Sequence, residues 1–547
     1  MGKDYLSCNL CTEHRLSYIM TKLKAAIIVD NMQIAKWQKS ALDYASDVLD
    51  VRYILNCTNT TSQKDVVKNF LYYGLNVISL RNSETVKTEI RSDSAKVVTF
   101  EALQKGSWQR FSKHISSEIN PNDFDVIIKF GMSLLRIDGP LSNIPVLSFH
   151  HGDPSKYRGR PAGFYELANN EDKLGIIVQK LSNKLDAGEV YAFAYSKINH
   201  TSYKKTALNF YKVSKFMLRQ AVINLQNKTP LTLSKTGENY TLPTNSKVLK
   251  FGTKLAMRKT KHLLYGAFYE KKWNVALCPF DRSFEGDVVL QKASFQELPI
   301  EPQYSFYADP FFSGTGREIR FEAMDKKTGL GDIVEIDRVL KNNAALILSG
   351  KHYSYPYTFT YKNAEYVLPE VASHSAPYYF NVKDGPDKKI AIKGLEDLRI
   401  VDASLIESDD QVYLFFGLQE NAANVLQLYV SNSLNGTFNQ HPASPIALDP
   451  ECSRMGGRLI KRDGKTYRFG QNNMRGYGAS ISILEINTLT STAYKETKVG
   501  SFSIDDGLGP HTIDLSPEGD TLLFDFYTQK FSVFAGYRRL LNKLASR

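Results

Sequence analysis

The chain has 547 residues, of which 42% are hydrophobic, 12% aromatic and 23% charged, and its formal net charge at pH 7 is +12. At roughly 100–200 residues per domain this length predicts several domains, and the hydrophobic and aromatic content excludes a mainly disordered chain. No apolar run approaches the ~20 residues that a membrane-spanning helix needs. The charge excess is small per residue, so it does not indicate nucleic acid, although it suits anionic substrates or a membrane surface.

The N-terminal segment is predicted to be a disordered tail, because residues 1–19 show no periodic pattern. Asp4 and Glu13 stand where a secretory signal would need apolar residues. The five cysteines are too few and too scattered for a disulfide framework. We therefore expect a cytoplasmic protein.

Residues 20–230 alternate between short β-rich runs and stretches with helical periodicity. Strands alternating with helices predict βαβ units and a mostly parallel, Rossmann-like α/β sheet. Ligands of such sheets gather at the carboxyl ends of the strands, so we expect chemistry just after Phe130 and just after Phe149. The expected strands are 25–29, 51–55, 125–130 and 145–149, and the expected helices are 32–44, 65–73 and 202–226.

The pattern changes after this region. Residues 231–270 contain a basic amphipathic stretch, 250–262, and are predicted to be a basic linker that partly folds. From 271 to 547 the pattern is strand-like, and paired strands with a period of about 50 residues predict an all-β five-bladed propeller. An immunoglobulin-type sandwich is the alternative, but its turns would recur every ~8–12 residues. The tight turns fall at 314–316, 363–364, 409–410, 463–464 and 518–519.

Two segments of the α/β region carry residues suited to acyl transfer. Segment 148–159 follows an expected strand and contains His150, and segment 185–189 contains Asp186 before a glycine. The histidine could stabilise the oxyanion that forms when an amine attacks a carbonyl. The aspartate could orient that histidine and a water and help to move the proton. The alternative is that His150 and His151 merely lie near a loop.

These segments resemble the 10-formyltetrahydrofolate-dependent formyltransferases of methionyl-tRNA, glycinamide ribonucleotide and amino sugars. The family's Asn-x-His strand end, Tyr-Arg-Gly loop and Leu-Asp-x-Gly loop are similar to 148–150, 157–159 and 185–188, within a likeness that covers roughly 22–230. The resemblance implies catalytic roles for His150, Asp186 and Ser148. It further implies folate contacts for Phe130, Gly131, Met132, Leu134, Leu135 and Leu185, and substrate contacts for His151, Lys156, Tyr157 and Arg158.

One departure from the family concerns the oxyanion site. The family's asparagine, whose side-chain amide donates to the formyl oxygen, is Ser148 here. Loss of one oxyanion donor can cost ~10²–10³ in rate where nothing replaces it. A water, His151 or a backbone N–H could fill the position, so Ser148 marks either a variation within the family or a lost activity.

The β-rich region carries a second set of candidates. Innermost strands of a propeller point residues into a central channel, so we expect Asp309, Tyr355, Asp402, Arg454 and His511 to meet at one mouth. The second strands end at Glu322, Glu370 and Asp525.

This region is similar to five-bladed glycosidase-type propellers of the arabinanase and xylosidase kind. It also resembles the propeller-like domain of plant glucosamine inositolphosphorylceramide transferases, on residues 355–357, 368–370, 453–457, 469–471 and 477–478. A glycosidase needs two carboxylates, and Asp309 could be the base with Glu370 or Glu451 as the acid. Arg454 stands where such hydrolases usually place the acid. Glycan or nucleotide-sugar binding by Asp309, Tyr355, Asp402 and Arg454, or a pure scaffold, are the other interpretations.

Two basic amphipathic segments, 250–262 and 537–547, could rest on an anionic membrane surface, or they could dock on the protein itself. We expect no nucleic-acid partner and no metal. The interpretation that unites these features is transfer of a formyl group from 10-formyltetrahydrofolate to a primary amine. The amine would belong to an amino sugar or nucleotide-linked amino sugar in surface glycan biosynthesis, with the propeller binding carbohydrate. The alternatives are a catalytically silent formyltransferase-like domain on a carbohydrate-binding protein, and a propeller glycoside hydrolase.

Overall fold

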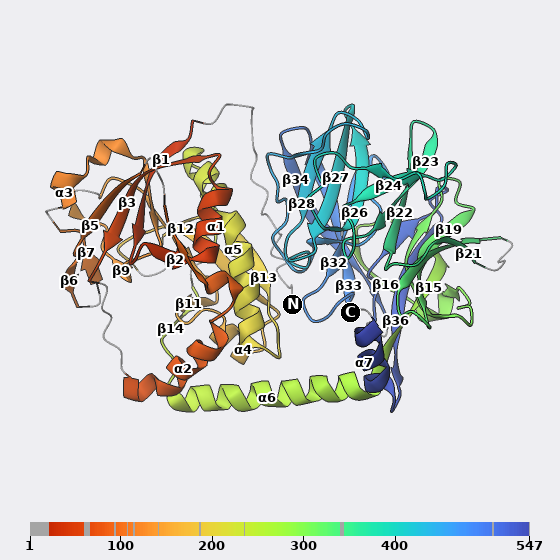
Figure 1. Ribbon diagram of the computed structural model, residues 1–547, viewed down its shortest axis with the longest axis horizontal. Helices are drawn as coiled ribbons and strands as arrows, with labels where there is room; N and C mark the ends of the chain where they lie inside the picture. Colours follow the sequence, from red (N-terminus) through yellow and green to blue (C-terminus); the bar gives the residue numbers. More distant parts are fainter. Residues whose placement is uncertain are drawn as a thin grey trace. The chain divides into compact units, whose positions relative to one another are not determined.

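The computed structural model divides the chain into two compact units that meet in the sequence between Thr260 and Lys261 (Figure 1). The predicted tail, 1–19, lies outside the described residues. None of the described helices combines the length and apolar character needed to cross a membrane. The described residues are 21–59, 66–91, 95–106, 108–112, 115–139, 142–184, 188–234, 236–339, 344–505 and 508–545.

The first unit is built on a seven-stranded sheet of order β13-β12-β10-β8-β1-β3-β5. Strands β1, β3, β5, β8 and β10 run parallel, and β12 and β13 are antiparallel to their neighbours. The chain order reverses between β1 and β8, which is the switch point at which such sheets bind ligands. The strands are β1 (Leu23–Val29), β3 (Leu49–Cys57), β5 (Lys96–Phe100), β8 (Val126–Lys129), β10 (Val146–His150), β12 (Lys173–Lys180) and β13 (Glu189–Lys197).

Helices α1 (Lys36–Tyr44) and α5 (Tyr203–Gln226) pack together and α5 covers β12 and β13. The long helix begins where expected, because the Ser202 side chain caps it by accepting from the Lys205 N–H at 3.2 Å. Helix α1 begins four residues later than expected. Residues Gln33–Ala35 (β2) instead pair with Lys87–Glu89 (β4), so they are held as strand.

Smaller elements complete this unit. Helix α2 (Val66–Ser79) extends beyond the expected 65–73. Among the described residues, the strands β6 (Leu103–Lys105), β7 (Trp108–Arg110) and β9 (Leu134–Leu135) form a small sheet. A core cluster that includes Ile127, Leu135 and Val146 fills the space beside them. The remaining elements are α3 (Ile115–Glu118), α4 (Phe164–Ala168) and the pair β11 (Tyr157–Gly159) and β14 (Glu238–Tyr240).

The segment predicted as a linker, 231–270, is more regular than expected. It contains β14 and most of α6 (Asn245–Phe268), a helix of 24 residues without a single acidic side chain. Of its side chains, only Val248 and Phe251 are buried. Helical propensity of Lys, Leu, Ala, Arg and Met explains the helix, although little of it is packed.

Five sheets make up the described part of the second unit. Three of them follow the chain order: β18 (Tyr304–Phe312) to β21 (Ala345–Leu348), β22 (Ser354–Tyr361) to β25 (Ile390–Ala391), and β26 (Ile400–Ser408) to β29 (Asn439–Gln440). Their inner members are β19 (Glu318–Asp325), β20 (Gly331–Asp337), β23 (Ala364–Glu370), β24 (Tyr378–Asn381), β27 (Gln411–Leu418) and β28 (Gln427–Ser431).

The other two sheets combine strands from both ends of the unit. One has the order β30 (Arg454–Met455), β32 (Lys465–Asn472), β33 (Ser480–Leu489), β34 (Tyr494–Ile504) and β16 (Gly286–Leu290), with β31 (Ile460–Arg462) also on β32. The other has the order β35 (Ile513–Leu515), β36 (Thr521–Phe531), β15 (Tyr269–Pro279) and β17 (Gln296–Glu297). Helix α7 (Ala535–Ala545) follows β36.

Each predicted turn joins two paired strands of one sheet, at β18–β19, β22–β23, β26–β27, β31–β32 and β35–β36. These turns contain left-handed residues, as at Asp409 (φ 50°) and Asp410 (φ 57°). Tight hairpins need residues with positive φ, which Asp, Asn and Gly adopt most readily. These residue types therefore located the predicted turns correctly.

The ends of the second unit are interlocked. Strand β15 near its start pairs along eleven residues with β36 near its end, and β16 pairs with β34. The predicted order, an α/β unit followed by a β-rich unit, is confirmed.

Candidate functional site

Four residues at the end of strand β10 lie on two opposite faces of the sheet. Alternation along the strand places Ser148 and His150 on one face and Phe149 and His151 on the other. The second face packs against helices: the Phe149 ring lies 5.1 Å from the ring of Trp37, on α1. Val146, two residues before Ser148, lies on the first face and belongs to the core cluster on the side of the sheet opposite these helices.

His151 lies among aromatic rings. Its ring centroid is 5.4 Å from that of Trp37 and 4.9 Å from that of Phe210, and its Nε2 lies 2.9 Å from the Ser214 hydroxyl. Burial, with a smaller contribution from the charge of His150, lowers the pKa of His151 to about 3. The imidazole is therefore neutral and lies on the face away from Ser148, so it does not replace the missing asparagine, although His151 also lines a hollow beside His150. Its direct contact with substrate stays a prediction.

The residues expected to line a folate pocket differ in accessibility. Met132 and Leu135 are buried in the core, whereas Phe130 and Leu134 are half-buried. Gly131 has no room for a side chain, because a Cβ there would lie 2.5 Å from Asp30 Oδ1. Leu185 and Asp186 lie outside the described residues.

The loop that leads to Asp186 is tied to the β9 side of the sheet. Asn183 accepts from the Ile137 N–H at 2.8 Å and donates to the Ile137 carbonyl at 3.0 Å. Arg136 donates to the Asn183 carbonyl at 3.2 Å. These three hydrogen bonds fix Asn183 beside residues 136–137. Asn183 stands three positions before Asp186 in the sequence.

Sequence reasoning missed two charged groups at the switch point. Asp30 follows β1 directly and accepts from the Met132 N–H, and Lys129 ends β8. Burial raises the pKa of Asp30 and lowers the pKa of Lys129 to about 8. The signal was present, since both residues stand at carboxyl ends of expected parallel strands.

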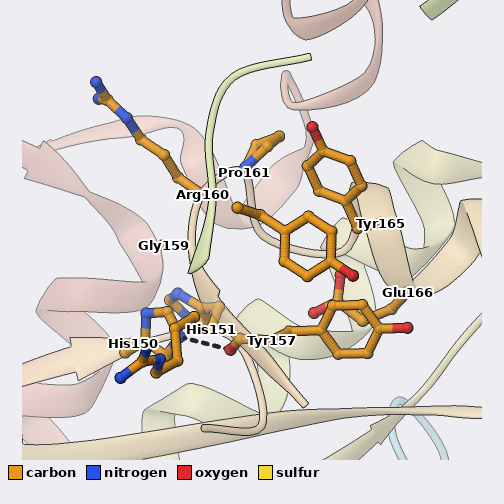
Figure 2. Close-up of a pocket in the computed structure, with 10 residues that line it drawn as sticks. His150, His151, Tyr157, Gly159, Arg160, Pro161, Tyr165 and Glu166 are labelled. Carbon is orange, nitrogen blue, oxygen red and sulfur yellow. Dashed lines mark hydrogen bonds between the residues drawn. The ribbon is translucent and has the colours of Figure 1, made fainter. Parts of the chain in front are cut away.

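A small hollow, open to the surface and with room inside it for about one water molecule, lies beside His150 (Figure 2). The His150 Nε2 is 3.3 Å from the Tyr157 carbonyl oxygen. The walls include three tyrosines, of which Tyr240 lies 5.3 Å from the Tyr157 ring and 4.3 Å from the Tyr165 ring. Its enclosed space is far below the ~300–1,000 Å³ of ordinary ligand pockets, so a ligand larger than water would lie across its open mouth rather than inside it.

The predicted substrate contacts around this hollow have local partners. The Lys156 ammonium pairs with Glu171 at 3.2 Å, and the Tyr157 hydroxyl donates to the same carboxylate at 3.1 Å. Arg158 donates from Nε to the Gly237 carbonyl at 2.9 Å. These bonds fix the 156–158 loop against its neighbours.

Glu166 is a further lining residue that sequence reasoning missed. It stands on α4 between buried apolar residues and is itself 3% exposed. Burial raises its pKa to about 8, so at neutral pH the carboxyl group is mostly protonated and can donate a hydrogen bond. An acid inside an otherwise apolar helix turn was the available signal.

In the second unit, the structure brings a buried histidine between two aspartates. His511 Nδ1 lies 2.6 Å from Asp525 and its Nε2 lies 3.1 Å from Asp309. Burial alone would lower the pKa of His511, but the charges of Asp525 and Asp309 outweigh it and raise the pKa to about 10. These three residues could also group around a metal ion, yet both imidazole nitrogens already face carboxylates. The imidazolium explains the arrangement.

Asp402 and Arg454 form the second part of this cluster. Their side chains form an ion pair, and Gln471 donates to the same carboxylate at 3.1 Å. The Arg454 guanidinium lies 5.1 Å from the ring centroid of Tyr477, whose ring is also 5.1 Å from that of His511. Tyr477 is 41% exposed, so an aromatic ring at the edge of a charged cluster remains open to a ligand.

Tyr355 has a different position from the one expected of a sugar-stacking residue. It is 1% exposed, and its hydroxyl accepts from the Gly457 N–H at 2.9 Å and contacts Ser404 at 3.1 Å. The Tyr355 side chain thus joins β22 to the segment after β30 and has a structural role. Tyr477, rather than Tyr355, offers the open ring.

Three residues in equivalent positions have strained backbones. Asp309, Tyr355 and Asp402 have φ of 52°, 43° and 47°, each at an irregularity of the first strand of its sheet. Non-glycine residues in this region cost of order 1–3 kcal/mol each and persist where the surroundings over-determine them. Such strain concentrates at functional sites, and all three residues here are buried.

Two further carboxylates accompany the cluster. Burial, followed by the charge of Asp309, raises the pKa of Glu322, and burial, followed by the charge of Asp402, raises that of Glu370. Glu370 also accepts from the Asp402 N–H at 3.2 Å. Glu451, the other acid considered, instead pairs with Lys498 at 2.5 Å.

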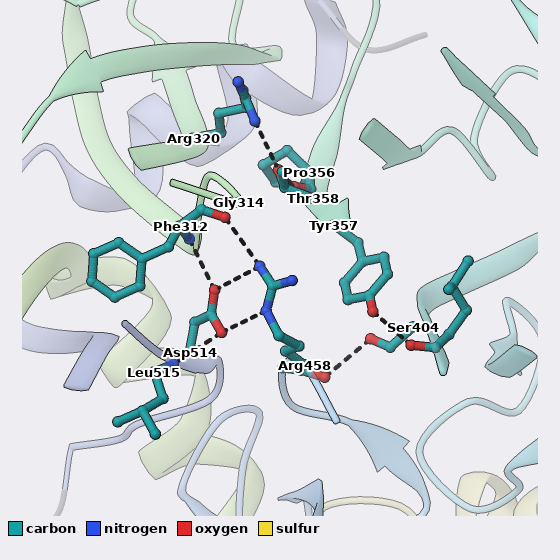
Figure 3. Close-up of polar contacts among 12 residues, drawn as sticks. Phe312, Gly314, Arg320, Pro356, Tyr357, Thr358, Ser404, Arg458, Asp514 and Leu515 are labelled. Carbon is teal, nitrogen blue, oxygen red and sulfur yellow. Dashed lines mark hydrogen bonds and ion pairs between the residues drawn. The ribbon is translucent and has the colours of Figure 1, made fainter. Parts of the chain in front are cut away.

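A separate buried ion pair joins strands from different sheets (Figure 3). Arg458 donates to Asp514 at 2.8 and 3.0 Å and to the Phe312 carbonyl at 3.0 Å. Asp514 also accepts from the Phe312 N–H at 2.9 Å. These bonds satisfy the buried charges, so this pair is structural.

Comparison with known proteins relates the second unit to a plant enzyme. Residues 284–508 match the family described as glucosamine inositolphosphorylceramide transferase 1, N-terminal. The protein of that name from Oryza sativa subsp. japonica is 32% identical over 219 residues, which cover 37% of this chain and 29% of the rice protein. The Arabidopsis thaliana protein is 29% identical over 213 residues, or 36% and 27% of the two chains. The chain thus spans less than a third of the length of these relatives.

Solved structures similar to this chain include formyltransferases at low identity. A sugar N-formyltransferase from Shewanella sp FDAARGOS_354 is 11% identical, with a TM-score of 0.25, over 40% of this chain and 76% of that one. Glycinamide ribonucleotide transformylase 1 from Symbiobacterium toebii is 10% identical, with a TM-score of 0.27, over 41% and 94%.

Proposed function

We propose that the first unit transfers a formyl group from 10-formyltetrahydrofolate to a primary amine of an amino sugar or nucleotide-linked amino sugar. The observation that supports this most directly is the placement of Ser148 and His150 on one face at the carboxyl end of β10, beside an open hollow. The resemblance of segments 148–159 and 185–188 to the formyltransferase motifs supports the same chemistry.

The folate would supply an activated formyl carbon. His150 would donate to the oxyanion that forms on this carbon, and Ser148, two residues earlier on the same face, would place a hydroxyl nearby. Asp186 would orient His150 and accept the amine proton through a water. Phe130 and Leu134 are half-buried, so they retain exposed apolar surface that the folate would contact. Met132 and Leu135 are buried in the core and do not retain such surface.

The sugar that carries the amine would lie across the open mouth of the hollow beside His150. Its tyrosine walls suit the apolar face of a sugar ring, and the protonated Glu166 can donate to a sugar hydroxyl. Because the hollow is small, the remainder of a nucleotide-linked substrate would lie outside it.

Calorimetric titration with 5-formyltetrahydrofolate tests the donor site. Wild type should bind saturably and Asp186→Ala should bind more weakly, whereas Asp50→Ala, on β3, should match wild type. Formyl transfer from 10-formyltetrahydrofolate to a panel of amino sugars should then fall ~10²–10³-fold in His150→Ala. Absence of binding at millimolar ligand would refute the proposal and leave the silent-domain alternative.

We further propose that the five sheets of the second unit are the blades of a propeller whose central cluster binds a glycan or nucleotide sugar. The interlocked pairing of β15 with β36, the regular hairpins, and the convergence of Asp309, Asp402, Arg454 and His511 support this arrangement. Similarity to a transferase named for glucosamine supports a carbohydrate ligand.

Binding of amino sugars and their nucleotide conjugates, measured with the full chain, tests this second site. Tyr477→Ala and Asp402→Asn should each weaken binding, because one removes the open ring and the other removes the partner of Arg454. Tyr537→Ala, which removes another exposed tyrosine of the same unit, is the control. Equal losses in all three variants would contradict a site at the cluster.

A glycoside hydrolase is the second candidate, favoured by one observation. Burial alone would raise the pKa of Asp309, but His511 and Thr512 outweigh it and hold the pKa below its usual value, while that of Glu370 is raised. One ionised and one protonated carboxyl group are the pair that glycoside hydrolysis needs. Release of reducing sugar from glycans, abolished in Asp309→Asn, would establish this function.

A further inference from the structure

An exposed apolar surface lies where the last strand and last helix of the second unit meet the end of α6. Its members are large hydrophobic side chains that are 38–62% exposed. A single exposed hydrophobic residue is ordinary, but a contiguous group of this size on a protein surface marks an interaction site. We call it the terminal patch: Leu263, Leu264, Phe268, Tyr269, Phe531, Val533, Phe534, Tyr537 and Leu540.

Three contacts hold together the two segments that carry these residues. The Ser532 N–H donates to the Phe268 carbonyl at 2.8 Å, and Arg539 donates to the Tyr269 carbonyl at 2.6 Å. The Phe268 and Phe531 rings stack at 6.1 Å. Helix α7 is thereby held against the end of α6, as Figure 1 shows. The surface thus combines segments more than 260 residues apart in the sequence.

The charged residues of the two segments that carry the patch are almost all basic. Between 261 and 272 and between 528 and 545 the only acidic residue is Glu270, which pairs with Arg538 at 2.7 Å. The basic residues of these two segments are Lys261, Lys271, Lys272, Lys530, Arg538, Arg539 and Lys543.

We propose that the terminal patch docks the protein on an anionic membrane surface. Apolar side chains that enter the headgroup region, ringed by lysine and arginine, are the combination that binds acidic bilayers peripherally. A second copy of the chain is the poorer occupant, because a symmetric contact would bring the two positive rings together. The partner is therefore a bilayer rich in acidic lipid, on which the second unit lies.

The two components of this binding have separate signatures. Each lysine near an acidic leaflet contributes roughly fivefold in affinity, and this contribution falls as salt shortens the screening length. The apolar component depends on buried area and persists at high salt. Charge variants should therefore act only on acidic vesicles, whereas apolar variants should act on all binding.

Co-flotation of the full chain with vesicles tests the proposal. Wild type should float with vesicles of phosphatidylcholine and phosphatidylserine and much less with pure phosphatidylcholine. Lys272→Gln with Lys530→Gln should lower the affinity for acidic vesicles roughly 25-fold. The triple variant Phe534→Ser, Tyr537→Ser, Leu540→Ser should abolish flotation.

Matched controls use exposed side chains elsewhere on the same unit. Val339→Ser with Leu346→Ser removes two exposed apolar groups, and Lys327→Gln with Lys393→Gln removes two exposed charges. Wild type that fails to float with acidic vesicles would overturn the proposal, as would controls that lose as much binding as the patch variants. A dimer in light scattering that the triple variant converts to monomer, with flotation unchanged, would overturn it in favour of a contact between copies. The lysine variant alters only exposed side chains, so it decides the question even if the triple variant fails to fold.

Discussion

The buried His511 imidazolium should make the stability of the second unit depend on alkaline pH. The ring lies between Asp525 at 2.6 Å and Asp309 at 3.1 Å, and it is 2% exposed. Substitution His511→Gln keeps a polar side chain of similar reach but removes the cation. Two buried carboxylates then lose their counter-charge, and the broken buried pair should cost about 3–5 kcal/mol of unfolding free energy at pH 7.

The pH dependence follows from the shift of the His511 pKa from 6.5 to about 10. Because the folded value is raised, the folded state holds a proton that the unfolded state releases above its own pKa. The contribution of His511 is therefore fully present below pH 6.5 and is lost as the pH rises through 10. Linkage gives a fall of about 1.4 kcal/mol per pH unit between these values, or about 5 kcal/mol in all.

Trp273 provides a reporter for this unit alone. Its ring centroid is 4.2 Å from that of His511, and the other two tryptophans, Trp37 and Trp108, belong to the first unit. Urea unfolding followed by Trp273 fluorescence, with Trp37→Phe and Trp108→Phe in the background, should show the alkaline decline in wild type. His511→Gln should remove most of it.

A second buried histidine is the matched control. The His441 Nε2–H donates to the Thr490 carbonyl oxygen at 2.8 Å, and burial lowers the pKa of His441. His441→Gln should therefore leave the slope above pH 7 unchanged. A wild-type stability that is flat between neutral pH and pH 10, or an equal decline in His511→Gln, would refute the assignment of a protonated imidazole at this position.

Three further changes test other parts of the structure. Arg468→Met should destabilise the second unit by about 3–5 kcal/mol in urea unfolding, because the fully buried Arg468 binds both oxygens of Glu496 at 2.7 and 2.6 Å; an effect below 1 kcal/mol would show that the pair is dispensable. His151 has a pKa of about 3 in the folded state, so below pH 6.5 the unfolded state takes up a proton that the folded state does not, and the free energy of unfolding falls. His151→Leu should therefore make the stability of the first unit less sensitive to acid below pH 6.5, as measured by Trp37 fluorescence. Gly457→Ala should prevent native packing in circular-dichroism melts, because a Cβ there would lie 1.9 Å from the Ile513 carbonyl oxygen; a wild-type melting temperature would contradict it.

Much of the fold could be predicted from local patterns. The strand that ends at His150 and the helix that begins after Ser202 were placed to within one or two residues. The five predicted hairpin turns of the second unit, rich in glycine, asparagine and aspartate, all join paired strands. The helix at 245–268 was underestimated, because its pattern of bases without acids suggested a linker rather than a regular element.

The candidate sites, like the fold, were only partly predictable from the sequence. Alternation along β10 was enough to separate the two histidines in principle, but only the packed structure assigns His151 to the aromatic core. Likewise Tyr355 and Tyr477 are both tyrosines near predicted turns, and only burial distinguishes the structural one from the exposed one.

By itself, then, the sequence determined the main strands and helices of the α/β region, five hairpin turns and the motif at 148–159, because these depend on residues a few positions apart. The tertiary structure alone decided that His511 lies beside Asp309, 202 positions earlier in the chain, that Glu166 is buried, and that the ends of α6 and β36 are held together. Charge state and exposure depend on which distant side chains exclude water from a group, and no local pattern contains that information.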